Sequence, residues 1–207
     1  MPLQKVQGKS GLVILGVIVA IGILLFLMLL PSINKIPTQD ESVNAAWSQV
    51  SNQYQRRADL IPNLVNTVKG YASHEKEVLT AVTEARAKVG QMTLPKDILT
   101  NPQAFSQFQA AQTQLSSALS RLMVVVERYP DLKANQNFLA LQSQLEGTEN
   151  RISVARRDYI QAVQTFNTTL RTIPGRWVAA IFYPDMKVKQ NFTVSPQTEA
   201  APVVNFK

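Results

Sequence analysis

The sequence contains no cysteine and a single histidine, His74, among its 207 residues. The absence of cysteine excludes disulfide bonds, thiolate metal sites, iron–sulfur clusters and a cysteine nucleophile. One histidine leaves no partner for a two-histidine metal site. A solvent-exposed position among charged helical residues suits His74 better than proton sensing does. These absences disfavour an enzyme, and we expect no metal ion and no other cofactor.

Charge and turn-forming residues are also scarce. Only 17% of the residues are charged and the chain has 8 glycines, against 45% apolar residues, which excludes disordered and collagen-like chains. Lys5, Lys9 and Lys35 precede residue 38, and from there basic residues exceed the 14 acidic ones by only four. Such a weak excess does not form the basic footprint of a nucleic-acid binder. We therefore expect neither nucleic acid nor a small-molecule substrate as a partner.

The segment 11–30 has no charged side chain and no hydroxyl group. As a helix it would rise about 30 Å, the thickness of the hydrocarbon core of a bilayer. A cleaved signal peptide is the alternative, but its apolar core spans only about 7–15 residues. Ile33 is also too large for the small position that precedes a cleavage site. We therefore predict an uncleaved transmembrane anchor in the lipid bilayer, represented by Gly11, Leu12, Gly16, Ala20 and Leu30.

The charges that flank this segment predict its orientation. The amino terminus, Lys5 and Lys9 stand on one side, and Lys35 alone stands on the other. The positive-inside bias favours a cytoplasmic N-terminus and a domain outside the cytoplasm. Gly16 and Ala20 have the spacing that lets two anchors pack closely, although the apolar composition alone also explains the pair.

Residues at alternating steps of three and four from Val43 to Val89 are apolar except for Arg57 and Glu75, as along a coiled-coil seam. Thr38 and Glu41 have the spacing of a capping box and predict a helix start. Pro62 interrupts the seam without changing its register. This favours a kinked continuous helix over a break.

Two further helices follow the same period. Asn101 and Pro102 supply a cap and a first helical residue for one that ends near Tyr129. The other carries a large side chain at every seventh position: Phe138, Leu145, Ile152, Tyr159, Phe166 and Ile173. Three helices with such seams bury them in a left-handed, antiparallel, up-and-down bundle. The middle helix is the shortest, so we expect part of the seam to remain free for a partner or for the tail.

These patterns predict an all-α chain: an N-terminal transmembrane helix, an elongated bundle of three long helices plus a short fourth, and an extended tail. The expected order is a basic tail at 1–10, the anchor at 11–30, a linker at 31–37, the bundle at 38–183 and the C-terminal tail at 184–207.

The segment 56–63 places charges, a proline and a polar seam position within eight residues. Its candidates for interaction or structural polarity are Arg56, Arg57, Asp59, Pro62 and Asn63. One hypothesis is a contact site for a partner or a second subunit. The favoured one is a structural ion pair between Arg57 and Glu149 or Asp158 of the third helix, because a buried charge requires a partner.

A short apolar run follows the third helix. Its candidate interfacial residues are Trp177, Ile181, Phe182 and Tyr183. Aromatic residues with polar tips suit a membrane interface. A fourth short helix that closes the bundle end is the alternative, and we favour it because the run has little polar face.

Several longer runs closely resemble the signature of the bacterial LemA family. They are Ala46-Trp47, residues 56–65, 68–75, 82–86, 129–135, Glu149-Asn150-Arg151-Ile152, 155–159 and the ending 202–206. The resemblance implies a single-pass anchor with a helical bundle and no established catalytic activity. A related magnetosome protein is linked to shaping membrane invaginations. Members also occur beside membrane proteins of the envelope stress response, including a metalloprotease.

Sequence and resemblance together predict a non-enzymatic scaffold in the bacterial inner membrane that forms homo-oligomers or organises the envelope and bends the bilayer. The alternative is an adaptor or sensor that recruits a membrane-protein partner, such as a protease or a signalling protein. A hydrolase is a weaker rival, because no paired catalytic constellation stands out among the acidic and hydroxyl residues.

Overall fold

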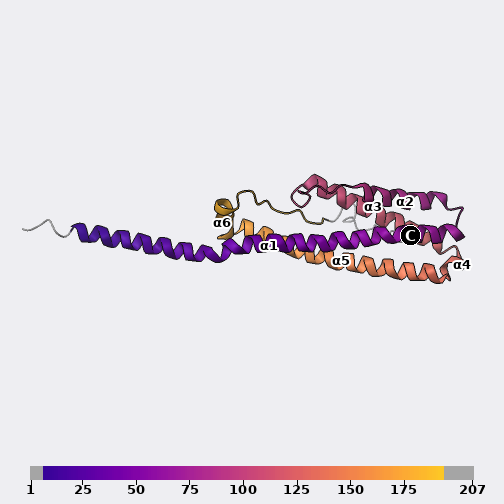
Figure 1. Cartoon of the computed structure of the whole chain (residues 1–207), viewed down its shortest axis with the longest axis horizontal. Coiled ribbons are helices and arrows are strands. Elements are labelled where there is room, and N and C mark those ends of the chain that lie inside the picture. The colour runs from indigo at the N-terminus through magenta and orange to yellow at the C-terminus, as the bar shows by residue number, and fades with distance from the viewer. Residues whose placement is uncertain (1–6, 194–207) are drawn as a thin grey trace, which may run out of the picture. The chain divides into compact units, whose positions relative to one another are not determined.

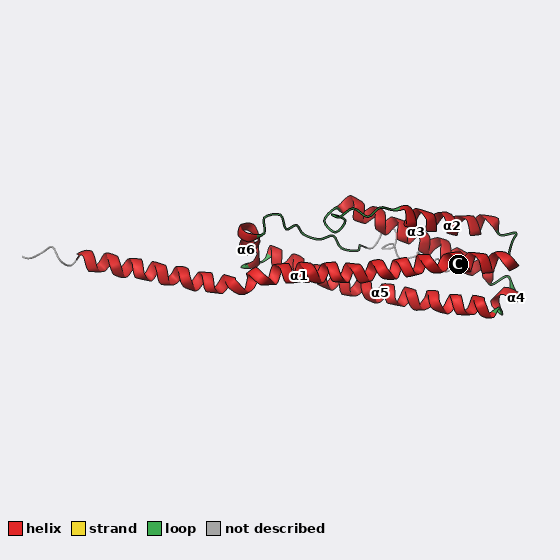
Figure 2. Cartoon of the chain, in the orientation of Figure 1, coloured by secondary structure: helices red, strands yellow, loops and turns green. Residues whose placement is uncertain are grey.

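The computed structural model describes the backbone of residues 7–193 and the side chains of residues 11, 13–24, 27 and 30–193. Its elements are all helices, and the described residues contain no strand (Figures 1 and 2). They are α1 (Gln7–Tyr71), α2 (Lys76–Gln91), α3 (Pro102–Val126), α4 (Pro130–Lys133), α5 (Gln136–Arg171) and α6 (Gly175–Phe182). The prediction of an all-α chain is confirmed.

The first helix is longer at its start than the sequence predicts. α1 runs without a break through residues 31–37, so the expected helix start at Thr38 is wrong. The Thr38 hydroxyl instead donates a hydrogen bond of 2.8 Å to the carbonyl oxygen of Asn34, one turn earlier in the same helix. At Pro62 the expectation of a continuous helix is confirmed, since α1 continues to Tyr71.

The expected single helix from Val43 to Val89 is wrong at its far end, because the chain turns between Tyr71 and Lys76. Glu75 is half-buried in this turn and accepts a 3.0 Å hydrogen bond from the Tyr129 hydroxyl. The reversal folds α2 back toward α1, so that Leu79, Val82 and Ala85 enter the same apolar core. One predicted helix is therefore two.

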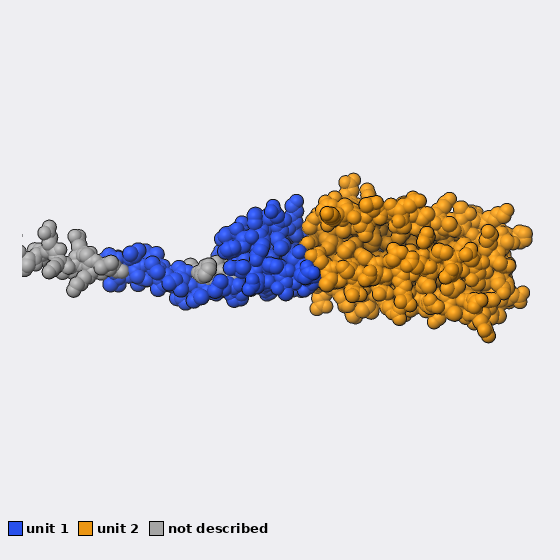
Figure 3. Space-filling view, viewed as in Figure 1, with its two compact units in different colours: residues 1–42, 165–188 blue, residues 43–164, 189–207 orange. Residues whose placement is uncertain are grey.

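The chain forms two compact units (Figure 3). Unit 1 contains residues 7–42 and 165–188 of the described chain, and unit 2 contains residues 43–164 and 189–193.

Unit 2 is an up-and-down arrangement of four long helices. Trp47 of α1 lies near Phe105 of α3 and Tyr159 of α5, with ring centroids 5.7 and 5.5 Å apart. Further along α1, Arg57 meets Gln112 of α3 and Glu149 of α5. Residue numbers thus rise together along α1 and α3 and fall along α5, while α2 returns antiparallel after the turn. The sequence predicted three long helices, and the turn adds one.

The predicted seams form the core of unit 2. From α1 it buries Val43, Val50, Tyr54, Ile61, Leu64 and Val68, and from α5 it buries Phe138, Leu145, Ile152 and Tyr159. Full burial of one such aliphatic or aromatic side chain stabilises a fold by about 1.5–3 kcal/mol. Phe166 is also buried, within unit 1. Ile173 is not: α5 ends at Arg171, and this side chain is 63% exposed, so its expected inward position is wrong.

One cap is confirmed in detail. The Asn101 side-chain oxygen accepts hydrogen bonds of 3.1 Å from the backbone N–H groups of Gln103 and Ala104. Pro102 occupies the first turn, where its missing N–H group has no cost. Local sequence alone therefore determines where α3 begins.

Between Val13 and Leu30 the described large apolar side chains of α1 are exposed, whereas Ile36 is buried. Large exposed residues along this part of the helix are Val13, Ile14, Leu15, Val17, Ile18, Val19, Ile21, Ile23, Leu24, Leu27 and Leu30. Within the described residues, no helix combines the length and the apolar character needed to cross a membrane. The transmembrane helix predicted at residues 11–30 is therefore not confirmed. The side chains of Leu12, Leu25, Phe26, Met28 and Leu29 lie outside the described residues.

Candidate interaction surfaces and the buried arginine

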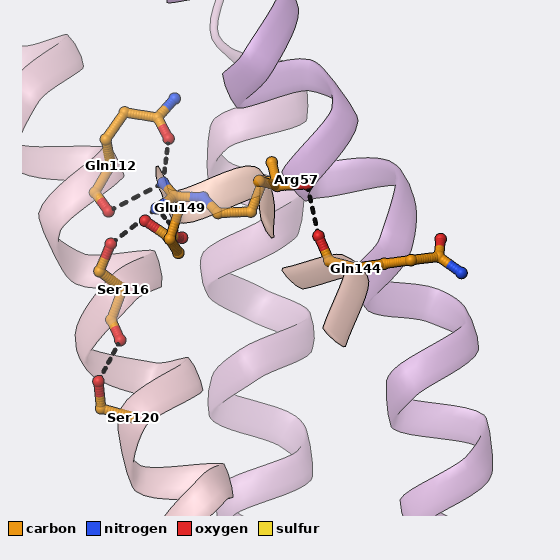
Figure 4. Close-up of polar contacts among 7 residues, drawn as sticks. Arg57, Gln112, Ser116, Ser120, Gln144 and Glu149 are labelled. Atoms are coloured by element: carbon orange, nitrogen blue, oxygen red, sulfur yellow. Dashed lines mark hydrogen bonds and ion pairs between the residues drawn. The ribbon is translucent and has the colours of Figure 1, made fainter. Parts of the chain in front are cut away.

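Arg57 is buried in unit 2, with only 1% of its surface exposed, and Figure 4 shows its polar contacts. One terminal nitrogen, Nη1, donates hydrogen bonds of 2.8 Å to Ser116 Oγ and to Glu149 Oε1. The other, Nη2, donates to the side-chain oxygen of Gln112 at 2.6 Å and to its backbone oxygen at 3.4 Å. One guanidinium thereby joins α1, α3 and α5.

The contact between Arg57 and Glu149 is a charge pair of unequal burial. The Glu149 side chain is 46% exposed, so its carboxylate pairs with the buried arginine while remaining accessible to solvent. Arg57 Nε is buried and makes no hydrogen bond within the described part of the chain. The guanidinium carbon lies 5.1 Å from the centre of the Tyr54 ring, a distance suited to a cation–π contact. The favoured interpretation of Arg57 as a structural ion pair agrees with this geometry.

The other candidates in segment 56–63 do not join this network. Arg56, Asp59, Pro62 and Asn63 are all exposed on α1. Asp59 accepts a 2.8 Å hydrogen bond from the Gln55 side chain on the same helix. Asp158, the alternative partner for Arg57, lies 3.5 Å from Arg157 instead. Of the five candidates in this segment, only Arg57 is buried, and the other four lie on the exposed surface of α1.

A second feature, absent from the sequence predictions, is an aromatic cluster in unit 2. It contains Trp47, Tyr54, Phe105, Phe108, Tyr159 and Phe192. Phe192 belongs to the extended segment after α6, and the Arg156 guanidinium lies 4.4 Å from the centre of its ring. The Tyr159 hydroxyl donates a 2.8 Å hydrogen bond to the Gln190 carbonyl oxygen, which fixes this segment on the bundle.

Burial shifts the acidity of two tyrosines in this cluster. Desolvation raises the pKa of Tyr159 far above its ordinary value. Burial also raises the pKa of Tyr54, although the guanidinium groups of Arg156 and Arg57 oppose the shift. In the sequence, residues 187–192 alternate between polar and apolar side chains in part, which indicates an extended segment but not the place where it docks.

The short helix α6 presents the third feature. Trp177, Ile181 and Phe182 are exposed, whereas Gly175 and Val178 are buried. Tyr183 is half-buried, and its hydroxyl donates a 3.0 Å hydrogen bond to the Ile33 carbonyl oxygen of α1. The four candidate interfacial residues therefore lie together at one helix, three outward and one tied to α1.

Unit 2 also carries a groove between α3 and α5. Its floor is apolar and its rim holds two carboxylates; the lining residues are Ser116, Leu119, Ser120, Met123, Gln142, Leu145, Glu146, Glu149 and Asn150. His74 is exposed in the turn before α2. Across the described residues, no three His, Asp or Glu side chains are grouped so that they could hold a metal ion.

Comparison with known proteins identifies one family whose model covers all the residues of the Arg57 network. The model of the LemA family matches residues 46–206. This chain belongs to the LemA family. The match includes Arg57, Gln112 and Glu149, and it extends across α6 into the tail.

Individual relatives are more distant. Protein LemA of Metamycoplasma hominis is 28% identical over 166 residues, which cover 80% of this chain and 71% of that protein. Magnetosome protein MamQ 2 of Paramagnetospirillum magneticum is 26% identical over 191 residues, which cover 84% of this chain and 70% of that protein. Magnetosome protein MamQ of Magnetospirillum gryphiswaldense is 24% identical over 169 residues, or 74% of this chain and 62% of that protein.

Proposed function

We propose that this LemA-family chain is a non-enzymatic, membrane-associated helical scaffold that binds the bilayer through unit 1 and contacts other copies of itself through unit 2. The proposal rests on one observation above all. The first part of α1 carries large apolar side chains on its whole exposed circumference, from Val13 to Leu30.

Water is a poor environment for such a surface. A helix that is apolar all round requires burial in a protein core or in lipid. Unit 2 buries its own apolar seams within four helices, so its core does not require such an environment. The likeness to two magnetosome proteins is consistent with a role at a membrane.

Vesicle flotation tests the membrane association. We compare the full chain with a variant that carries Ile14→Asp, Ile18→Asp and Ile21→Asp, three exposed positions of unit 1. The matched control carries Val124→Asp, Leu139→Asp and Val154→Asp, three exposed apolar positions of unit 2. The chain and the control should float with lipid, and the unit 1 variant should remain at the bottom, because buried unpaired charges are costly. Flotation of all three proteins, or of none, would contradict the proposal.

The groove between α3 and α5 supports two versions of the role. A second copy that rests on its apolar floor would give a self-assembling scaffold, and anchoring at a membrane would raise the effective concentration of copies. The acidic rim, Glu146 and Glu149, instead favours an adaptor that binds a basic helix of a membrane-protein partner.

Thiol crosslinking in intact cells separates these versions. Because the chain has no cysteine, Ser120→Cys places one thiol at the groove and Ser153→Cys places one on an exposed surface outside it. Links between two Ser120→Cys chains support the scaffold. Links from the same position to one defined membrane protein support the adaptor. If Ser153→Cys forms the same crosslinks as Ser120→Cys, the groove is not the contact surface in either version.

The side of the membrane on which unit 2 lies stays a prediction of the charge bias around residues 11–30. The same Ser153→Cys variant tests it. A membrane-impermeant thiol reagent should label this position in whole cells if unit 2 is outside the cytoplasm. Labelling only after lysis would reverse the assignment.

A further inference from the structure

The helix α6 is apolar on its outer face as well as its inner one. Gly175 and Val178 are buried, whereas Trp177 is 53% and Ile181 67% exposed. These last two residues are four positions apart and so lie on the same side of the helix. A helix that only closes the end of a bundle would present polar side chains to water on that side. The outer face of α6 therefore lacks a partner among the described residues of unit 1.

Packing inside unit 1 holds this face in a fixed place. A Cβ atom at Gly175 would overlap the carbonyl oxygen of Thr169, so the start of α6 approaches the end of α5 as closely as a backbone can. At the other end, the Tyr183 hydroxyl bonds to the Ile33 carbonyl oxygen at 3.0 Å. Ile33 follows the last exposed apolar residue of the α1 segment, Leu30, by less than one turn. The outer face of α6 and the exposed apolar surface of α1 thus meet at one level of α1.

Exposed basic side chains lie on the segments that form this level: Arg171, Arg176 and Lys187, and Lys35 of α1. Segment 165–188 contains a single acidic residue, Asp185, and α1 carries Asp40 and Glu41 between one and two turns beyond Lys35. Basic residues that border an apolar surface complement the phosphate groups of anionic lipids. Tryptophan and tyrosine favour the same zone, between acyl chains and headgroups.

We propose that α6 is an interfacial helix, which inserts Trp177 and Ile181 into the headgroup boundary of an anionic phospholipid bilayer beside the apolar segment of α1. The inference rests on the proposed membrane association and adds to it a second contact, with a stated depth and lipid charge. A bilayer suits the surface better than a partner protein does. The Tyr183–Ile33 hydrogen bond brings the end of α6 within one turn of Leu30, the last exposed apolar residue of the α1 segment, and both segments carry exposed basic side chains, Arg176 and Lys35.

The two tryptophans of the chain allow a direct test. Trp47→Phe leaves Trp177 as the single tryptophan, and Trp177→Phe leaves Trp47, which lies in the aromatic cluster of unit 2. Each full-length variant is reconstituted into vesicles whose acyl chains carry bromine either near the headgroup or near the chain end. We expect bromine near the headgroup to quench Trp177 at least about twofold more strongly than bromine near the chain end. Trp47 should not respond to either lipid.

Lipid charge provides the second measurement. Quenching of Trp177 should increase when phosphatidylglycerol replaces part of the phosphatidylcholine, and Arg176→Gln should reduce that increase. The Asp185→Asn control, which removes the acidic residue of the segment, should not reduce it. Helical circular dichroism of each variant verifies that the fold is retained.

Vesicle flotation of the same samples separates the two proposals. If the chain floats but Trp177 remains accessible to aqueous iodide and insensitive to brominated lipid, α6 is not interfacial and the membrane association stands. A chain that does not float contradicts the membrane association as well. Quenching that is equal in neutral and anionic vesicles overturns the assignment of anionic headgroups.

Discussion

Two stretches of α1 use the same kind of residue in opposite ways. Between Val13 and Leu30 the described large apolar side chains are exposed, whereas between Val43 and Val68 those of the seam are buried: Val43, Val50, Tyr54, Ile61, Leu64 and Val68. Both stretches belong to one uninterrupted helix. In the first stretch every position is apolar, whereas in the second stretch most positions off the seam are polar.

That difference determines what each stretch requires from its surroundings. A periodic seam lies along one side of a helix, so neighbouring helices of unit 2 on that side can bury the apolar residues of the second stretch. A helix that is apolar at every position has no polar side, so neighbouring helices on one side cannot cover its whole apolar surface. Unit 2 therefore covers its own apolar seam, whereas the described large apolar side chains between Val13 and Leu30 stay exposed.

The largest expected contrast comes from removing one aromatic ring in each unit. Phe108 is buried in the aromatic cluster of unit 2, and Phe182 is exposed on α6 of unit 1. Phe108→Ala should lower the free energy of unfolding by about 3–5 kcal/mol, since it leaves a cavity. Phe182→Ala should change it by less than about 0.5 kcal/mol. Urea unfolding of the full chain in mild detergent, followed by helical circular dichroism, measures both, and equal losses would remove the distinction between the units.

The next contrast sits on the α5 seam. Ile152 is buried midway along it, and its neighbour Ser153 is exposed. Ile152→Ala should cost about 2–5 kcal/mol through lost transfer energy and the remaining cavity. Ser153→Ala should cost less than about 0.5 kcal/mol. If Ile152→Ala leaves the melting temperature unchanged but abolishes self-crosslinking, the residue belongs to an interface between copies and the seam assignment fails.

A smaller effect is expected at the buried charge pair. Glu149→Ala removes the 2.8 Å bond to Arg57 and leaves a buried guanidinium without its counter-charge. Because Glu149 is itself half-exposed, the expected cost is that of one hydrogen bond to a charged group, about 1.5–3 kcal/mol. The control is Asp158→Ala, which breaks an exposed pair with Arg157 and should cost less than about 1 kcal/mol. Equal costs would show that the Arg57 network does not stabilise unit 2.

Much of unit 2 could be predicted because its signals are local and periodic. The seven-residue spacing identified Phe138, Leu145, Ile152 and Tyr159 as core, and Asn101 identified the start of α3. The odd polar seam position correctly indicated Arg57 as a buried charge that needs a partner.

The turn at residues 72–75 could not be predicted from the same signals. The seam continues through Tyr71 and Glu75 at the right spacing, and no proline marks a break. The turn is held by tertiary contacts, among them the hydrogen bonds from Tyr129 to Glu75 and from Asn135 to Tyr71. A pattern read along one helix contains no information about such contacts, and for the same reason it does not indicate where Phe192 docks.

The smallest expected effect compares two tyrosine hydroxyls, each of which donates to a backbone carbonyl oxygen: Tyr159 to Gln190 in unit 2, and Tyr183 to Ile33 in unit 1. Tyr159→Phe should lower the free energy of unfolding by about 1 kcal/mol, because the Tyr159 side chain is fully buried. Tyr183→Phe should lower it less, since that hydroxyl is only half-buried.

The pH dependence of the free energy of unfolding separates the effect of burying an ionisable hydroxyl from the effect of losing its hydrogen bond. Burial raises the pKa of Tyr159 in the folded chain, while the unfolded chain ionises near pH 10. Its contribution to stability is therefore complete below about pH 10 and is lost as the pH rises above it, because the unfolded state releases its proton first. Tyr159→Phe removes this loss, so the stability of the variant should fall less steeply than that of the parent above about pH 10. Urea unfolding at a series of alkaline pH values measures the two slopes, and parallel slopes would mean that Tyr159 titrates in the folded chain as it does in water.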